Sequence, residues 1–214
     1  TLFKTFKFIN SNRLLRDQIL LNFIVSVVMM TTLITGPFYL THGLLLTSEN
    51  MGLVMSVGPM TSVIFGFISG NLVDRVGSML VIKVGLFQLL IGALTFTILP
   101  SLLGASGFAI SAVLLSIGYQ LFLSANSSHV MNSIPADQRG LASGSLSLSR
   151  NLGLIAGAYF MGGIFNLCIN NTNSSTTSSE AVSESLQITF YIAAVLIIFS
   201  IFSHLKNQKR KNYE

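Results

Sequence analysis

The residue with the most distinctive chemistry is Arg150, because it is the only charged side chain well inside a long apolar run. Counted from Leu141 at about 1.5 Å per residue, it lies about 13 Å into that run. If the run crosses a membrane, burying the guanidinium costs at least about 2.5–3.5 kcal/mol. Arg150 must then face a protein interior or a wet cavity, or extend to the surface. Structural anchoring and contact with a substrate are both open roles for it.

Other polar side chains within the apolar runs are candidates for lining a cavity. Each alone favours an interhelical hydrogen bond, which contributes about 0.6 kcal/mol in a membrane. As a group they predict a large, weakly polar cavity, and the candidates are Asn22, Gln88, Tyr119, Gln120, Asn126, Arg150 and Asn151.

Patterns for covalent chemistry are missing from the sequence. It has no nucleotide-binding glycine motif, no zinc-binding H-E-x-x-H pattern and no paired carboxylates, and its one cysteine, Cys168, excludes an internal disulfide. We therefore expect no enzyme activity, no catalytic residue, no cofactor and no metal. Acidic residues lie only near the ends of the apolar runs or between them, which leaves His42 as the internal titratable group available to a proton relay.

The elements that position these side chains must be membrane-spanning helices. The 214 residues are 51% hydrophobic and only 9% charged, whereas soluble domains carry about 25% charged residues. Runs of about 20 apolar residues are long enough to cross a bilayer as helices. Six such runs occur, at 18–42, 51–72, 79–99, 106–128, 141–168 and 186–204. The sequence therefore predicts an all-α membrane protein with six transmembrane helices in a domain spanning 18–204.

The basic residues give the expected orientation. They lie before the first run, after the last run and at the connections near 73–78 and 129–140, except for Lys83 and Arg150, which lie in runs that start from that side. The opposite connections hold no Lys or Arg, and their charged residues are Glu49, Glu180 and Glu184. Under the positive-inside rule, both termini are cytoplasmic. This spread of the net charge of +5 along one side excludes a nucleic-acid site, which would gather its charge on one soluble face.

The segments outside the six runs have simple expected roles. Residues 1–17 are expected to be a cytoplasmic N-terminal segment and residues 205–214 a basic cytoplasmic tail. The polar segment 170–185 has too little apolar content to fold and is expected to be a mobile external loop. Pro37 and Pro59 fall inside the first two runs, where each removes a backbone hydrogen bond and kinks the helix. Whether these kinks are static or mobile stays open.

Glycine pairs at G-x-x-x-G spacing predict close helix packing. Such pairs put two glycines on one helix face, and another helix can approach that face closely. The pairs are Gly66 with Gly70, Gly140 with Gly144, and Gly153 with Gly157. Ordinary packing of membrane helices is enough to explain any single pair. The alternative role of these smooth faces is to let helices slide past one another during transport.

The most specific motif is the short connection between the second and third runs. It reads Gly70-Asn71-Leu72-Val73-Asp74-Arg75-Val76-Gly77, with glycines suited to a tight turn and Asp74 suited to capping the next helix. It resembles the signature loop of the major facilitator superfamily, G-x-L-x-D-R-x-G-R/K-R/K. Gly70, Leu72, Asp74, Arg75 and Gly77 match that pattern, whereas Ser78 and Met79 replace its two basic residues.

A second stretch carries the same resemblance. Residues 133–144 and 150–153 are similar to the fourth connection and fifth helix of the C-terminal half of drug:proton antiporters, especially the 14-helix branch. The resemblance implies one half of a major facilitator fold, namely its C-terminal six-helix half. It further implies a missing N-terminal half that holds the proton site and completes a central cavity for small lipophilic substrates.

The expected function is therefore transport across the cytoplasmic membrane of a bacterium by alternating access, as multidrug efflux by proton antiport. Because the chain starts at Thr1 rather than Met, we expect it to be part of a longer protein. Two alternatives stay open. One is a facilitator or symporter for another small solute, such as an organic acid paired with Arg150. The other is a truncated membrane subunit that does not transport.

Overall fold

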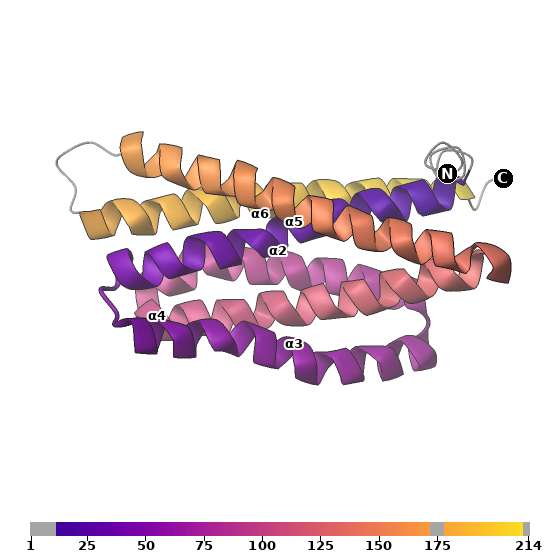
Figure 1. Ribbon diagram of the computed structural model, residues 1–214, viewed down its shortest axis with the longest axis horizontal. Coiled ribbons are helices and arrows are strands. Elements are labelled where there is room, and N and C mark those ends of the chain that lie inside the picture. Colours follow the sequence, from indigo (N-terminus) through magenta and orange to yellow (C-terminus); the bar gives the residue numbers. More distant parts are fainter. Residues whose placement is uncertain (1–11, 172–177, 212–214) are drawn as a thin grey trace.

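The computed structural model describes residues 12–171 and 178–211, and these form a bundle of long helices (Figure 1). In chain order the elements are α2 (Arg13–Phe38), the π-helix η1 (Tyr39–Gly43), α3 (Ser48–Val76), α4 (Ser78–Ser133), the 3-10 turn η2 (Ala136–Gln138), α5 (Arg139–Asn171) and α6 (Ser178–Lys211). Caps explain where the first helices begin. The Asn12 side chain accepts a hydrogen bond from the Leu15 amide at 3.1 Å, and Thr47 caps α3 in the same way.

Helix α4 folds back on itself at Gly104. That residue has φ 56° and ψ −128°, which is far from helical geometry and suits only glycine. On either side the two arms run antiparallel in close contact, since a Cβ on Gly85 would lie 2.6 Å from the Phe122 nitrogen and one on Gly92 would lie 2.6 Å from the Leu115 Cα. At about 1.5 Å per residue, 56 residues would otherwise extend far beyond a bilayer.

Within the described residues, five helical segments are long and apolar enough to cross a membrane. The sequence predicts six runs, and the difference lies in α4, which contains both 79–99 and 106–128. Each of the other four runs falls within one helical segment. The first run, 18–42, is covered by α2 together with η1. The chain is thus an integral membrane protein made of apolar helices.

Three predicted boundaries differ from the structure. Helix α2 begins at Arg13, inside the predicted N-terminal segment 1–17, and α6 extends to Lys211, through most of the predicted tail 205–214. The loop expected at 170–185 is wrong for residues 178–185, which form the first turns of α6. Residues 172–177 lie outside the described part of the chain.

The helical start of α6 has a packing explanation that polar composition alone concealed. Ala181 and Val182 are buried, and Ser179 donates a hydrogen bond to the Gly43 carbonyl at the end of η1. Two buried apolar residues and one hydrogen bond therefore hold this polar turn against η1.

The core lies between α2, the two arms of α4, and α6. Phe96 stacks on Phe190 with ring centroids 4.1 Å apart, and Phe108 meets the edge of Phe96 at 5.1 Å. Tyr39 stacks on Phe108, and its hydroxyl donates a 2.7 Å hydrogen bond to the Pro100 carbonyl beside the α4 turn. These contacts join the π-helix after Pro37 to the turn of α4.

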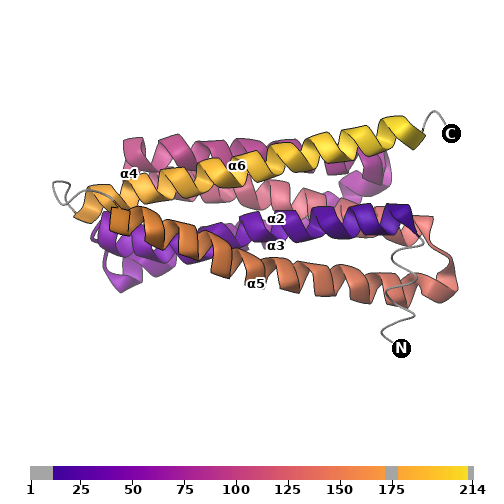
Figure 2. The ribbon, with the colours of Figure 1, turned by 90° about the horizontal axis from the view of Figure 1, so that it is seen from above.

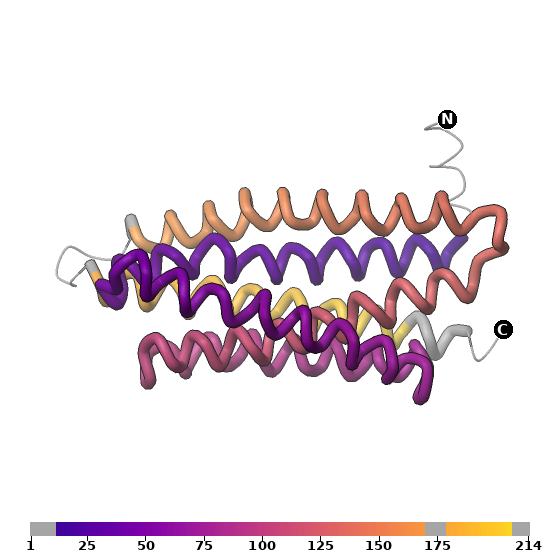
Figure 3. The backbone as a smooth tube through the Cα atoms, turned by 60° about the horizontal axis from the view of Figure 1, so that its bottom comes forward, coloured from indigo at the N-terminus to yellow at the C-terminus, as the bar shows by residue number. Residues whose placement is uncertain are grey.

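Helices α3 and α5 are the outer members of the bundle. Helix α5 packs mainly on α2, whereas α3 packs mainly on α4, as Figure 3 shows. The most apolar parts of α3 and α5 are the least buried of all the segments, so each leaves a long face uncovered. The turned view of Figure 2 places α5 and α4 on opposite sides of α2.

The predicted glycine pairs lie in different surroundings. A Cβ on Gly153 would lie 2.5 Å from the Phe23 carbonyl oxygen, and one on Gly157 would lie 2.7 Å from that of Val27, so α5 approaches the α2 backbone there. Gly66 has the Gln120 amide nitrogen 3.2 Å from its Cβ position. Within the described chain, Gly70, Gly140 and Gly144 have no atom within 4 Å of theirs.

Candidate functional site

The two ends of the bundle differ in the charge of their side chains. The described Lys and Arg side chains at the start of α2, the α3–α4 and α4–α5 connections and the end of α6 lie at one end, where Figure 1 also places both chain termini. We call this the basic end. Glu49 and Glu180, in the first turns of α3 and α6, lie at the other end.

The signature-loop residues form the tightest connection at the basic end. One residue, Gly77, separates α3 from α4, and its φ of 87° requires glycine. The Gly77 amide donates a 2.9 Å hydrogen bond to the Val73 carbonyl, which closes the last turn of α3. Gly70 and Leu72 lie on α3 about two turns and one and a half turns before Gly77, and both are partly buried.

The expected capping role of Asp74 is wrong. The N-cap of α4 is Gly77, with no hydrogen bond from a side chain. Asp74 instead lies in the last turn of α3 beside Arg75, and both side chains are exposed. The single-residue connection places them before the cap position, where they cannot act on the new helix.

Deeper in the bundle, polar side chains from three helices meet around Tyr119 of α4. The Tyr119 hydroxyl interacts electrostatically with the Ser26 hydroxyl of α2 and with the Arg150 guanidinium of α5. Ser26 also donates a 2.7 Å hydrogen bond to the Asn22 carbonyl. We call Ser26, Tyr119 and Arg150 the central polar cluster.

Asn22, one of the predicted cavity residues, is buried between α2 and α5 next to this cluster. Its side chain is only 2% exposed, and its amide nitrogen donates a 2.8 Å hydrogen bond to the Leu146 carbonyl of α5. Ser149 repeats this link between α5 and α2 with a 2.7 Å hydrogen bond to the Ile19 carbonyl. These bonds fix the register of α5 on α2, and Arg150 follows directly after Ser149.

The remaining predicted cavity residues lie apart. Gln120 lies against Gly66 of α3, Asn151 is exposed on α5, and Asn126 is buried with its amide nitrogen 3.4 Å from the Gln18 carbonyl. Gln88 donates a 3.2 Å hydrogen bond to the Leu114 carbonyl, which links the two arms of α4.

Two features of the site were missed in the sequence. Ser26 was missed because a serine in an apolar helix usually bonds to its own backbone, although its spacing of four residues from Asn22 places both on one helix face. His204, at the end of the sixth predicted run, is 5% exposed within α6, so His42 is not the only internal histidine.

Among the described residues, no group of three or more His, Cys, Asp or Glu side chains is placed to hold a metal ion. The central polar cluster combines a cation, a phenol and a hydroxyl, which are groups that can hydrogen-bond a small ligand. Its chemistry is therefore suited to binding.

Comparison with known proteins gives the following similarities. The sequence profile of the Major Facilitator Superfamily matches residues 2–158. The chain is 30% identical over 129 residues to the uncharacterized transporter YebQ of Escherichia coli (strain K12), covering 60% of this chain and 28% of that protein. It is 25% identical over 177 residues to the riboflavin transporter RibZ of Clostridioides difficile (strain 630), covering 81% of this chain and 39% of that protein. The chain thus matches well under half the length of these relatives.

Proposed function

Because the chain belongs to the Major Facilitator Superfamily, we propose that it forms the C-terminal half of a transporter that moves small molecules by alternating access. In this proposal the two arms of α4 each cross the membrane, which gives six crossings. Both termini then lie on the same side, and the excess of basic residues there favours the cytoplasm of a bacterium.

The uncovered faces of α3 and α5 support a missing N-terminal half. Each helix packs mainly on one neighbour, α3 on α4 and α5 on α2, and most of its apolar part is not buried. Gly140 and Gly144 on α5 have no neighbour at their Cβ positions within the described chain, and a G-x-x-x-G face is suited to a closely approaching helix. The short share of the relatives' length that the chain matches agrees with this.

The observation that carries a substrate site is the central polar cluster. Ser26, Tyr119 and Arg150 bring three helices together, and Arg150 is the one charged side chain far from the ends of α5. The surrounding residues are mostly apolar, which favours lipophilic substrates with an aromatic or weakly polar part. The similarity to a protein named as a riboflavin transporter agrees with an aromatic substrate.

We propose multidrug efflux by proton antiport as the specific activity. The test expresses the intact natural protein in bacteria that lack their own efflux pumps, and measures the export of a lipophilic fluorescent dye with and without a protonophore. We expect faster export that the protonophore abolishes. Tyr119→Ala should slow export, whereas Leu94→Ala, on the exposed side of α4, should leave it unchanged.

Arg150 favours a second candidate, the transport of an organic acid whose carboxylate pairs with the guanidinium. Uptake or export of radiolabelled carboxylic acids, with no effect on dyes, would favour this candidate over efflux. If the intact protein moves neither class of compound, the remaining interpretation is a membrane subunit that does not transport.

A further inference from the structure

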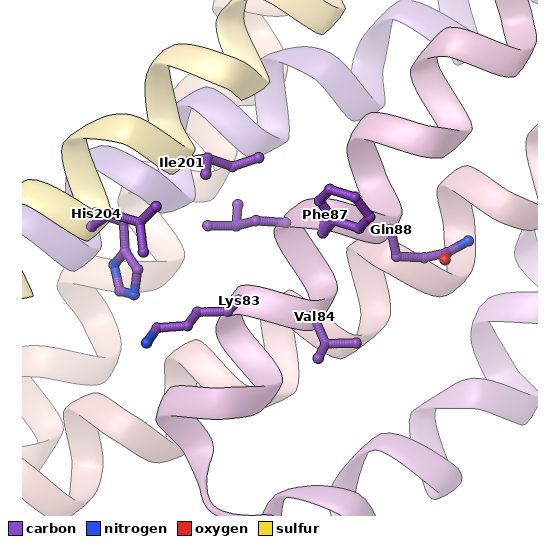
Figure 4. Close-up of a pocket in the computed structure, with 8 residues that line it drawn as sticks. Lys83, Val84, Phe87, Gln88, Ile201 and His204 are labelled. Carbon is purple, nitrogen blue, oxygen red and sulfur yellow. The ribbon is translucent and has the colours of Figure 1, made fainter.

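A cavity lies between the first arm of α4 and the last turns of α6, and no residue of the central polar cluster lines it (Figure 4). Its volume is about 410 Å³. Most of its wall is apolar, formed by Val84, Leu86, Phe87, Ile201 and Leu205. Three polar residues, Lys83, Gln88 and His204, complete the lining.

The polar groups gather at one end of this cavity. Figure 4 shows the Lys83 amine and the His204 imidazole pointing toward the same region, whereas Gln88 lies on the other side of Phe87. His204 interacts electrostatically with Lys83 and with His129 of the second α4 arm. His129 in turn lies 3.3 Å from the Ser78 hydroxyl at the start of α4. The Lys83 ammonium therefore supplies a positive charge, and the two imidazoles beside it supply N–H donors, near the basic end.

The apolar part of the cavity continues onto the outer surface of the bundle. Val84 is 43% exposed, Phe87 61% and Leu205 42%, and in a membrane-spanning helix such side chains contact lipid. Gln88 uses one N–H of its side-chain amide in the hydrogen bond to the Leu114 carbonyl. The cavity thus opens sideways to lipid and has its charge near one membrane surface.

We propose that this cavity binds one anionic phospholipid from the leaflet at the basic end. The phosphate contacts Lys83 and His204, and the upper part of an acyl chain lies along Val84, Phe87 and Ile201. Basic pockets between transmembrane helices suit anionic lipid headgroups. The apolar wall favours a lipid over a free anion, since a small hydrophilic ion would leave this wall without a partner.

The test measures lipid binding by native mass spectrometry of the intact natural protein in detergent. Phosphatidylglycerol and phosphatidylcholine with the same acyl chains are titrated separately. We expect the first phosphatidylglycerol to bind about tenfold more tightly than phosphatidylcholine. Lys83→Gln should abolish most of this roughly tenfold preference for phosphatidylglycerol, since it removes one charge-assisted hydrogen bond. Lys83→Arg should retain the preference for phosphatidylglycerol, and Val84→Trp should weaken binding of both lipids by narrowing the apolar wall.

Lys206→Gln is the matched control, because it removes the same charge from the same end of the bundle at a residue that does not line the cavity. We expect it to change binding by less than about twofold, the effect of diffuse attraction alone. Equal losses in Lys83→Gln and Lys206→Gln would overturn the proposal. So would displacement of phosphatidylglycerol by millimolar inorganic phosphate, which would identify a free-anion site. Lipid binding does not depend on transport, so this result and the efflux result can fail separately.

Discussion

Arg150 interacts electrostatically with Tyr119, which also interacts with the Ser26 hydroxyl. Ser26 donates a hydrogen bond to the Asn22 carbonyl, and the Asn22 side chain is bonded to α5. The charge of Arg150 thus belongs to a polar region formed by three helices. A structural role and a substrate-binding role of Arg150 predict different effects when its charge is removed.

Arg150→Gln removes the charge while keeping a side chain that can hydrogen-bond. In the organic-acid candidate, we expect uptake of a carboxylic acid to fall at least about tenfold, because a charge-assisted hydrogen bond is lost. Expression and dye binding should be retained. Radiolabelled acid uptake measures the effect, with Arg13→Gln, an exposed cation at the start of α2, as the control. Normal uptake by Arg150→Gln would exclude pairing with a carboxylate.

Gly77 is the other residue whose identity the structure explains. Its left-handed φ of 87° is costly for any residue with a Cβ, by about 1–2 kcal/mol. Gly77→Ala should therefore lower the thermal stability of the purified protein, measured by unfolding in detergent. Gly70→Ala is the control from the same motif, since it has open space at its Cβ position and a helical backbone. Equal stability of the two variants would show that the turn adapts to alanine.

At the scale of elements, the contact of α2 with α5 depends on glycines that let two backbones meet. Gly157→Ala would place a Cβ 2.7 Å from the Val27 carbonyl oxygen, so the helices must separate. We expect a loss of about 1–3 kcal/mol, typical of overpacking. Gly163→Ala, on the same helix with nothing within 4 Å, should be neutral. Thermal unfolding of both variants in detergent measures the difference.

A result in which Gly163→Ala is as destabilising as Gly157→Ala would mean that the close contact with α2 is not the cause of the loss, since alanine itself favours a helix over glycine. Because Ser149 and Asn22 bond the same two helices, a change in their spacing should also reach Arg150. Transport by Gly157→Ala is therefore expected to fall together with stability.

At the scale of the whole molecule, the opposite charges of the two ends predict the orientation in the membrane. Single cysteines replace Asn50, near the start of α3, or Asp74, near its end, in a Cys168→Ser background; both side chains are exposed. In intact cells, a maleimide that cannot cross the membrane should label the cysteine at 50 and leave the one at 74 unlabelled until the cells are opened. The reverse pattern would place the basic end outside and contradict the positive-inside rule.

The sequence by itself determined the class of the protein and the approximate places of its apolar helices. Apolar runs of bilayer length require helices, because lipid leaves no other way to satisfy the backbone, and the six predicted runs fall within five helical segments, of which α4 contains two runs. The signature motif and its glycine turn were likewise visible in the residues, because they are local in the chain.

Only the tertiary structure decided which polar residues meet. Hydropathy treats Asn22, Gln88 and Tyr119 alike, but the rotation and register of each helix send Asn22 to a backbone carbonyl, Gln88 between the arms of α4, and Tyr119 to Arg150. The start of α6 and the cavity between Lys83 and His204 also depend on contacts between residues far apart in the chain. Lipid specifies that a helix forms, whereas packing against neighbouring helices specifies which way each side chain faces.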